Sequence, residues 1–202
     1  MKHYILIPAI ALVLASCTSP EKKETKTTEK KETLSINISD ASIAWTAYKF
    51  TERVGVGGTF DTLSITASKT SGSAEEILIG STINIVTSSV NSGNIERDPK
   101  LRTSFFEVLN TPNIKGKVLK AENGKGEIEL TINQIIKVNT FDYAVNDSTM
   151  VLRSSVDVTN WNGSDAVAAL NKACELLHTG TDGSSKLWPD ADVTLTVPLI
   201  KK

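Results

Sequence analysis

The stretch Leu14-Ala15-Ser16-Cys17 combines residue types and a spacing that suit a covalent modification. Small side chains at Ala15 and Ser16 leave the backbone accessible to a peptidase, and the Cys17 thiol is a nucleophile that could take a diacylglyceryl group. The stretch matches the bacterial lipobox pattern, so we predict cleavage before Cys17 and lipidation of Cys17, with palmitate or a similar chain. The alternative is an ordinary secretory signal that happens to contain a cysteine.

The residues before Cys17 fit a segment that would direct this cysteine to a membrane. Lys2 supplies a positive charge, and an apolar run of eleven residues extends from Tyr4 to Leu14. A membrane-spanning helix needs roughly 20 apolar residues, whereas this run has the length of a signal-peptide core. We therefore predict a lipoprotein signal peptide at 1–16. Because Thr18 rather than Asp follows Cys17, we expect an outer-membrane lipoprotein of the cell envelope that faces the periplasm, with surface exposure also open.

A strongly charged segment separates Cys17 from the rest of the chain. Residues 18–33 contain five Lys, four Glu and no apolar side chain, so they cannot bury enough surface to offset chain entropy. We predict that 17–33, the lipidated cysteine included, is a disordered tether and that the folded domain is 34–202. The domain carries 16 Lys+Arg against 19 Asp+Glu. This balance argues against nucleic-acid binding and leaves the acyl chains to hold the membrane.

The few other residues that could do chemistry do not form a site. Glu175 and His178 have the spacing of half a di-iron ligand set, but the only other histidine is His3. No G-x-S-x-G motif is present to make His178 a general base, so we expect a surface histidine at a helix C-terminus. Cys174 lies on an apolar helix face and is expected to be buried and unpaired. The sequence therefore predicts no enzyme, no metal and no cofactor.

Alternating apolar and polar residues dominate the domain and predict strands with one buried face. The alternating sets are Ile77, Ile79, Ile83 and Ile85; Ile128, Leu130 and Ile132; Met150, Leu152, Ser154, Val156 and Val158; and Val193, Leu195, Val197 and Leu199. Turn signals separate them at Gly57-Gly58, Ser71-Gly72-Ser73, Glu122-Asn123-Gly124 and Asn146-Asp147-Ser148. Short turns imply antiparallel pairing. We predict an all-β fold of about eight strands, enough to close a barrel around one small ligand.

Two segments interrupt the strand pattern and are expected to be helical. Asp98 is a suitable N-cap for a short helix near 98–106. Ser164 is a suitable N-cap for an amphipathic helix near 164–178, whose apolar face includes Leu170. A helix of this length inserted between strands can cover the mouth of a barrel or pack on its wall.

Residues 89–118 carry the most specific motif, of the form N-x-x-R-D-x-x-L-R-S-x-x-F-F followed by a proline-containing turn. It is filled or nearly filled by Asn94, Arg97, Asp98, Leu101, Arg102, Ser104, Phe105 and Phe106. In this block the chain resembles the YceI-like family. The first hairpin (45–63) and the strand and turn at 126–137 are similar to the family's pattern, although a second glycine is absent from the latter. The helix 164–178 and the loop after it depart from that pattern.

The resemblance implies a lipocalin-like antiparallel barrel that holds an isoprenoid chain or another long amphiphile in an apolar central cavity. It implies no enzymatic activity. Together with the alternating pattern, it yields these candidate ligand-binding residues: Trp45, Phe60, Ile83, Ile85, Phe105, Phe106, Ile128, Leu130, Ile132, Leu152, Val156, Leu195 and Val197. Phe105 and Phe106 could instead both dock the short helix on the barrel. The expected partners are an isoprenoid-like or amphiphilic lipid and, through Cys17, the membrane.

The alternating pattern leaves a second interpretation open. The same aliphatic residues would also fill a ligand-free core, because period-two patterning does not distinguish a cavity from packing. In that case the chain would be an envelope stress or structural protein with a packed barrel. Its protein partner would bind the helix 164–178 and the loop 179–190.

Overall fold

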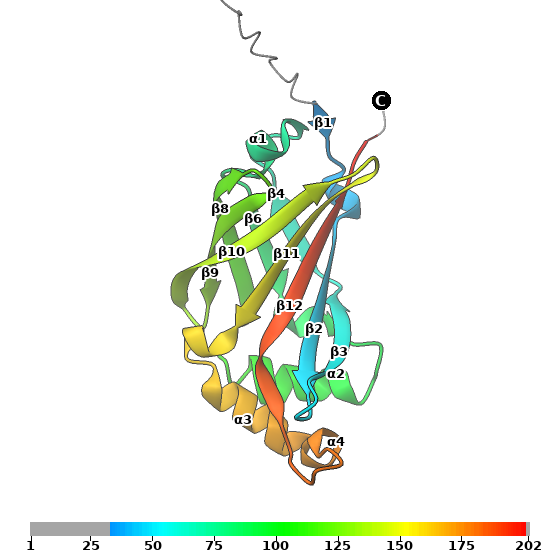
Figure 1. Cartoon of the computed structure of the whole chain (residues 1–202). Coiled ribbons are helices and arrows are strands. Elements are labelled where there is room, and N and C mark those ends of the chain that lie inside the picture. The colour runs from blue at the N-terminus through cyan, green and yellow to red at the C-terminus, as the bar shows by residue number, and fades with distance from the viewer. Residues whose placement is uncertain (1–32, 201–202) are drawn as a thin grey trace, which may run out of the picture. The chain divides into compact units, whose positions relative to one another are not determined.

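The computed structural model describes residues 33–200, in which ten strands form one curled antiparallel sheet (Figure 1). The predicted signal peptide, Cys17 and the predicted tether up to residue 32 lie outside the described residues. The ten strands are β2 (Ser42–Lys49), β3 (Val54–Phe60), β4 (Leu63–Thr66), β6 (Thr82–Val86), β7 (Val90–Asn91), β8 (Asn113–Glu122), β9 (Lys125–Ile132), β10 (Ile135–Val145), β11 (Thr149–Asp157) and β12 (Leu187–Pro198). The expected all-β antiparallel class is confirmed.

The order of strands across the sheet is β4-β6-β8-β9-β10-β11-β12-β2-β3-β7, so the sheet curls until its two edges meet at one corner. At this corner β3 runs through residues 61 and 62 into β4, and β6 runs through the helix η2 (Thr87–Ser89) into β7. The Asp61 amide donates to the Ser89 carbonyl at 3.0 Å, and the Val86 amide donates to the Thr62 carbonyl at 3.0 Å. Each bend divides one long strand in two, which accounts for ten strands where about eight were expected.

Two-residue turns set the register of the long hairpins β8–β9 and β9–β10. Asn123 and Gly124 both have positive φ, at 51° and 79°, as the type I′ turn requires. Asn133 and Gln134 adopt φ of 48° and 60° without a glycine. Two hydrogen bonds of Asn133 stabilise this turn: its side-chain Nδ2 donates to the Trp161 carbonyl at 3.0 Å, and its backbone amide donates to Thr111 Oγ1 at 2.8 Å.

Several expectations about local structure were wrong. Ile77 lies in a helix, α1 (Ala74–Leu78), with Ile79 at its C-cap, because Ser73 and Glu76 form a capping box that starts a helical turn. The pair Gly57-Gly58 lies inside β3 rather than in a turn. The remaining short elements are β1 (Leu34–Ser35), which pairs with β5 (Ser71–Gly72), and the 3-10 helices η1 (Ile38–Asp40) and η4 (Val158–Trp161).

The expected short helix near 98–106 is present as α2 (Arg97–Lys100) followed by the π-helix η3 (Leu101–Phe106). Its predicted cap is wrong. Asn94 Oδ1 accepts from the amides of Glu96 and Arg97, both at 3.0 Å, and so satisfies the helix start. Asp98 instead accepts from the Ser92 amide at 2.8 Å and the Ser92 hydroxyl at 2.6 Å, which ties the preceding loop to the helix.

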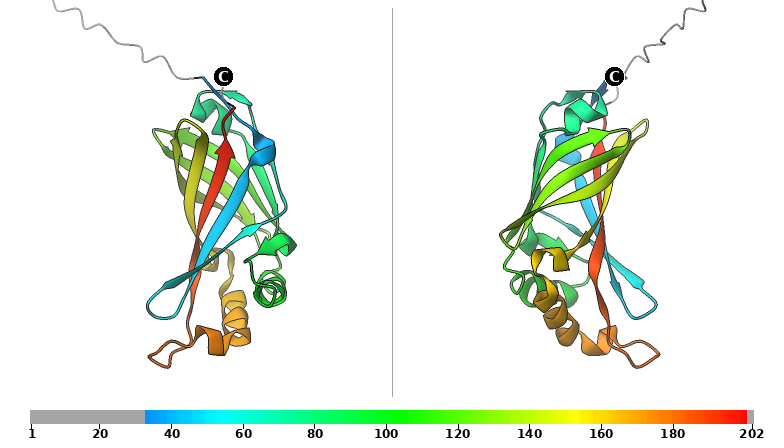
Figure 2. Two further views of the ribbon diagram at one scale, coloured as in Figure 1. Left: turned by 90° about the vertical axis from the view of Figure 1, so that its right-hand side faces the viewer. Right: turned by 60° about the vertical axis from the view of Figure 1, so that its left-hand side comes forward.

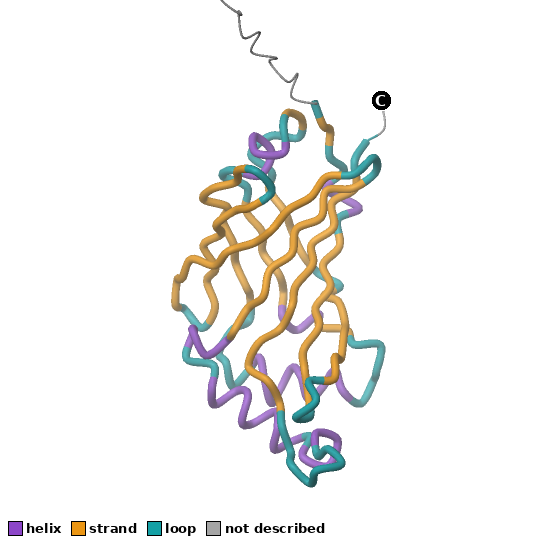
Figure 3. The backbone as a smooth tube through the Cα atoms, viewed as in Figure 1, coloured by secondary structure: helices purple, strands orange, loops and turns teal. Residues whose placement is uncertain are grey.

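The inserted helix is two helices, α3 (Ser164–Ala173) and α4 (Glu175–His178), rather than one. Cys174, with φ of −119°, leaves the helical conformation between them, and Gly163 rather than Ser164 precedes the first helical residue. Helices α2, α3 and α4 lie at the end of the sheet opposite to β1 and the last described residues, whereas α1 lies beside β1 (Figures 1, 2 and 3). Among residues 33–200, no helix has both the length and the apolar content needed to cross a membrane.

Two clusters of buried side chains fill the two ends of the sheet's interior. The first lies beneath α1 and includes Ile77, Phe141, Met150 and Val197. The second lies beside η4 and α3 and includes Leu109, Leu130, Ile132, Trp161 and Ala166. The partly buried Ile128 of β9 packs against both clusters.

Candidate functional site

A cavity of about 220 Å³ occupies the interior of the curled sheet between the two clusters. Nine of the ten strands contribute to its wall, and η3, η4 and α3 close its helical end. Its lining comprises Ile43, Trp45, Ala47, Phe60, Ile83, Ile85, Val90, Leu101, Phe105, Phe106, Leu109, Ile114, Ile128, Leu130, Ile132, Phe141, Leu152, Ser154, Val156, Val158, Leu170, Leu187, Pro189, Asp190, Ala191, Val193 and Leu195. All but two of these side chains are apolar.

The two polar residues of the lining are already paired. Ser154 Oγ donates to the Thr140 carbonyl at 2.7 Å and accepts from Asn139 Nδ2 at 2.9 Å. Asp190 receives both terminal nitrogens of the Arg53 guanidinium, and this hydrogen bonding lowers the pKa of its carboxyl. Throughout residues 33–200, no fully buried side-chain polar atom lacks a hydrogen-bond partner. The cavity wall therefore leaves no unpaired polar side chain to bind a polar group, and it favours an apolar chain.

Twelve of the thirteen candidate ligand-binding residues line this cavity. The remaining one, Val197, is buried in the cluster beneath α1, where it pairs with Met150. The period-two pattern placed the correct faces inward, but it could not show where along β12 the cavity ends and packing begins. Fifteen further residues line the cavity and were not among the candidates: Ile43, Ala47, Val90, Leu101, Leu109, Ile114, Phe141, Ser154, Val158, Leu170, Leu187, Pro189, Asp190, Ala191 and Val193. Of these, Ile43 and Ala191 follow the same alternation as residues that were chosen.

Trp45 forms a large part of the wall, and Gly58 on β3 makes room for it. A Cβ at Gly58 would lie 2.4 Å from Trp45 Cζ2 and 2.6 Å from the Asn91 carbonyl oxygen. The indole Nε1 donates to the Thr59 carbonyl at 3.1 Å, so the ring lies flat against its neighbouring strand. Gly58 therefore allows the Trp45 ring to form part of the cavity wall.

Phe105 and Phe106 both line the cavity, although they are adjacent in sequence. They lie in η3, where the Glu107 amide donates to the Arg102 carbonyl at 3.0 Å in an i to i+5 pattern. Phe106 packs edge-on against Phe60 with ring centroids 5.9 Å apart, and Phe105 packs against the cluster of Trp161. The two rings thus dock the helix and form cavity wall at once. Such π-helical turns are frequent at functional sites.

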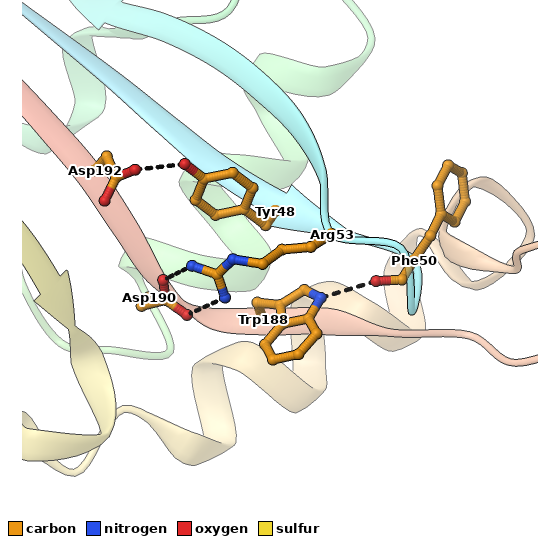
Figure 4. A network of polar contacts seen from close by, with 6 residues as sticks. All are labelled: Tyr48, Phe50, Arg53, Trp188, Asp190 and Asp192. Atoms are coloured by element: carbon orange, nitrogen blue, oxygen red, sulfur yellow. Dashed lines mark hydrogen bonds and ion pairs between the residues drawn. The ribbon is translucent and has the colours of Figure 1, made fainter.

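The seam between β12 and β2 is held by side chains where the backbone ladder breaks (Figure 4). Leu187 pairs with Lys49 and Ala191 with Ala47, so the three residues between them have no partner on β2. Trp188 Nε1 donates to the Phe50 carbonyl at 2.8 Å, and Arg53 stacks over the rings of Tyr48 and Trp188 while it binds Asp190. These contacts keep the cavity wall closed at a strand position that includes Pro189.

A second pocket of about 230 Å³ adjoins the cavity at its helical end, and we refer to it as the vestibule. Trp45, Ala47, Leu101, Leu170 and Leu187 line both spaces. The rest of the vestibule wall is more polar and consists of Tyr48, Lys49, Val56, Asn94, Glu96, Arg97, Lys100, Cys174, Leu177 and His178.

His178 is buried in the vestibule wall, and the expectation of a surface histidine was wrong. Its Nδ1 lies 3.0 Å from Asn171 Oδ1, and its carbonyl accepts from the Lys186 amide at 3.0 Å. Burial, reinforced by the charges of Lys49, Arg97 and Lys100, lowers the pKa of the imidazole, so the ring is neutral at neutral pH. His178 is four residues after Cys174 and eight after Leu170, so its ring lies on the same buried helix face as these two residues.

Cys174 lies in the same wall and is buried with a free thiol, as expected. Within the described part of the chain, no three His, Cys, Asp or Glu side chains come together as a metal site would need. The spacing of Glu175 and His178 therefore has no completing ligands there.

The sequence matches a known family, and the fold is similar to those of several solved structures. Residues 33–196 match the family described as the YceI-like domain. No protein of curated function matches the chain. Among solved structures, a polyisoprenoid binding domain from Saccharophagus degradans, implicated in plant cell wall breakdown, has a TM-score of 0.54 at 13% identity over 83% of this chain and 98% of that one.

Two further solved structures show the same fold. The Campylobacter jejuni YCEI protein has a TM-score of 0.54 at 20% identity, covering 76% of this chain and 90% of its own. Burkholderia cenocepacia BcnA has a TM-score of 0.53 at 11% identity, covering 81% and 98%. The family match spans most of the chain and includes the strands and the helix η3 that enclose the cavity. The chain therefore belongs to the YceI-like family.

Proposed function

We propose that this protein is a lipid-anchored, exported binding protein that holds an isoprenoid-like or other amphiphilic molecule in its barrel cavity. The observation that carries the proposal is the cavity itself, whose wall is apolar and whose two polar residues are already paired. Binding rather than catalysis fits such a wall, since it presents no reactive group to a ligand. The polyisoprenoid-binding relative supports the ligand class.

The size of the cavity is suited to hydrocarbon. Its volume of about 220 Å³ exceeds the ~150 Å³ of an engineered apolar cavity that stays dry and binds benzene. Burial of each CH₂ contributes about 0.8 kcal/mol. Several isoprene units could thus supply the gross stabilisation that micromolar binding, about −8 kcal/mol, requires after association costs.

Blocking the cavity tests the proposal. We expect a lipid to remain bound at one copy per chain when the full chain is purified gently from membranes, as measured by native mass spectrometry and lipid extraction. Ala47 lines both the cavity and the vestibule, so Ala47→Trp should abolish the bound lipid. Ala44→Trp is the matched control, because Ala44 is exposed on the same strand and should keep the lipid. An empty wild-type chain, or equal occupancy in both variants, would contradict the proposal.

Anchoring through Cys17 is a separate part of the proposal. It rests on the lipobox-like stretch and on the apolar run before it. We expect wild-type protein expressed in bacteria to incorporate labelled palmitate and to fractionate with the outer membrane. Cys17→Ser should abolish labelling and leave an uncleaved precursor that is visible as a heavier band. Normal cleavage of the variant would show instead an ordinary secretory signal.

Contact with an envelope protein is a second candidate, favoured by one surface observation. Ile95, Leu176 and Leu177 are exposed, and Ile95 precedes α2 while the two leucines lie in α4. An apolar surface of this kind can bind a partner. This candidate requires no ligand, so an empty cavity together with a partner that Leu176→Asp releases would favour it over lipid binding.

A further inference from the structure

The vestibule concentrates positive charge in a domain that is otherwise acidic. Residues 34–202 carry 16 Lys+Arg against 19 Asp+Glu, yet the vestibule wall contains Lys49, Arg97 and Lys100 with Glu96 as the one carboxylate. His178, whose lowered pKa leaves it neutral, adds no charge to the vestibule wall. Three cations are thus brought together where the overall composition would place more acids than bases.

None of these three cations forms an ion pair with a carboxylate within residues 33–200. Lys49 Nζ donates to the Leu177 carbonyl at 2.9 Å and lies over the Phe50 ring, so a backbone oxygen and an aromatic face hold its charge in place. Elsewhere in the domain, cations such as Arg53, Lys120 and Lys172 have acidic partners.

The position of the vestibule relates these charges to the cavity. Trp45, Ala47 and Leu101 are among the residues that line both spaces, so an apolar chain in the cavity would leave its polar end in the vestibule. Arg97 and Lys100 lie in α2, which leads directly into the cavity-lining η3. Lys49 reaches the same space from the end of β2.

We propose that the vestibule is a headgroup site and that the ligand is an anionic amphiphile, with a phosphate or carboxylate bound by Lys49, Arg97 and Lys100. This inference rests on the proposed function and names its ligand class more closely. Hydrogen bonds between a cation and an oxyanion are stronger than neutral ones. A partly enclosed pocket beside an apolar wall also screens them less than open solvent does.

Competition between matched ligands tests the headgroup. The full chain is incubated with farnesyl phosphate, farnesol and palmitate, and native mass spectrometry measures the occupancy of each. We expect farnesyl phosphate to be preferred over farnesol by about tenfold, which corresponds to ~1.4 kcal/mol. The preference should shrink as salt rises. Palmitate has a different chain, so it is compared with itself: a fall in its occupancy as salt rises would show that the site also accepts a carboxylate.

Removing the charges of Arg97 and Lys100 tests whether the headgroup binds in the vestibule. Arg97→Gln combined with Lys100→Gln should remove most of the tenfold preference for farnesyl phosphate while the occupancy by farnesol stays unchanged. Lys115→Gln combined with Lys117→Gln is the matched control, because these two lysines are exposed on β8 and line neither space. It removes the same charge and should leave the preference intact.

The outcomes separate this inference from the proposed function. Equal occupancy by farnesol and farnesyl phosphate would overturn the anionic headgroup and leave lipid binding intact. An unchanged preference in the Arg97 and Lys100 double variant, or an equal loss in the β8 control, would overturn the site. Failure of all three ligands to bind would overturn the proposed function as well.

Discussion

Ile132→Asp should destabilise the domain by several kcal/mol, measured as a lower midpoint of denaturant unfolding. Ile132 ends β9, is 3% exposed and belongs to the cluster of Leu130 and Trp161. The carboxylate would lie in an apolar interior without a partner, and the lost side chain would leave a void. The cost therefore combines desolvation of a charge with lost packing.

Ile136→Asp is the matched control for Ile132→Asp, since it makes the same chemical change four residues away. Ile136 lies on β10 and is 60% exposed, and its side chain points away from the cavity. A surface substitution of this kind is usually worth within about 0.5 kcal/mol. Comparable losses from the two variants would show that the alternation of faces in this hairpin has been misassigned.

Leu170→Ala should loosen the helical end of the barrel more than it lowers global stability. Leu170 lies on α3, is 6% exposed and contacts both the cavity and the vestibule. Removing a buried leucine costs about 2–5 kcal/mol, and here the cost should fall on the docking of one short helix. Amide hydrogen exchange should therefore become faster over 164–178 while the exchange of β9 and β10 stays unchanged, and bound farnesol should dissociate faster.

The control for the Leu170→Ala prediction is Leu176→Ala. Leu176 is 91% exposed in α4, so its truncation should change neither amide exchange nor ligand dissociation. If α3 exchanged only on global unfolding in both wild type and Leu170→Ala, the helix would be part of the core, and control of ligand access by α3 would be excluded.

The interior faces of the strands were predictable from the sequence because strand periodicity reports burial directly. Ile128, Leu130 and Ile132 alternate with charged or polar neighbours, and all three line the cavity. The same periodicity misled at Ile77, where the local capping box of Ser73 and Glu76 outweighed an apparent alternation. Local hydrogen bonding, which the apolar pattern does not include, decided that segment.

Long-range contacts were not predictable from the sequence. Arg53 and Asp190 are 137 residues apart, and their pairing depends on the register of β12 against β2. The burial of His178, in contrast, was predictable, because its spacing of four residues from Cys174 places both on one helix face. The vestibule combines residues from β2, α2 and α4, and only the assembled fold brings these three elements together.

The reactivity of the free Cys174 thiol can report on the occupancy of the vestibule, whose wall it lines. The sequence contains only one other cysteine, Cys17, which the proposed acylation would make unavailable to thiol reagents. Because Cys174 is buried and lines the vestibule, a ligand bound in the vestibule should slow its reaction with a small alkylating agent. The rate of its alkylation would then report whether the vestibule is filled, in the unaltered protein and without an attached dye.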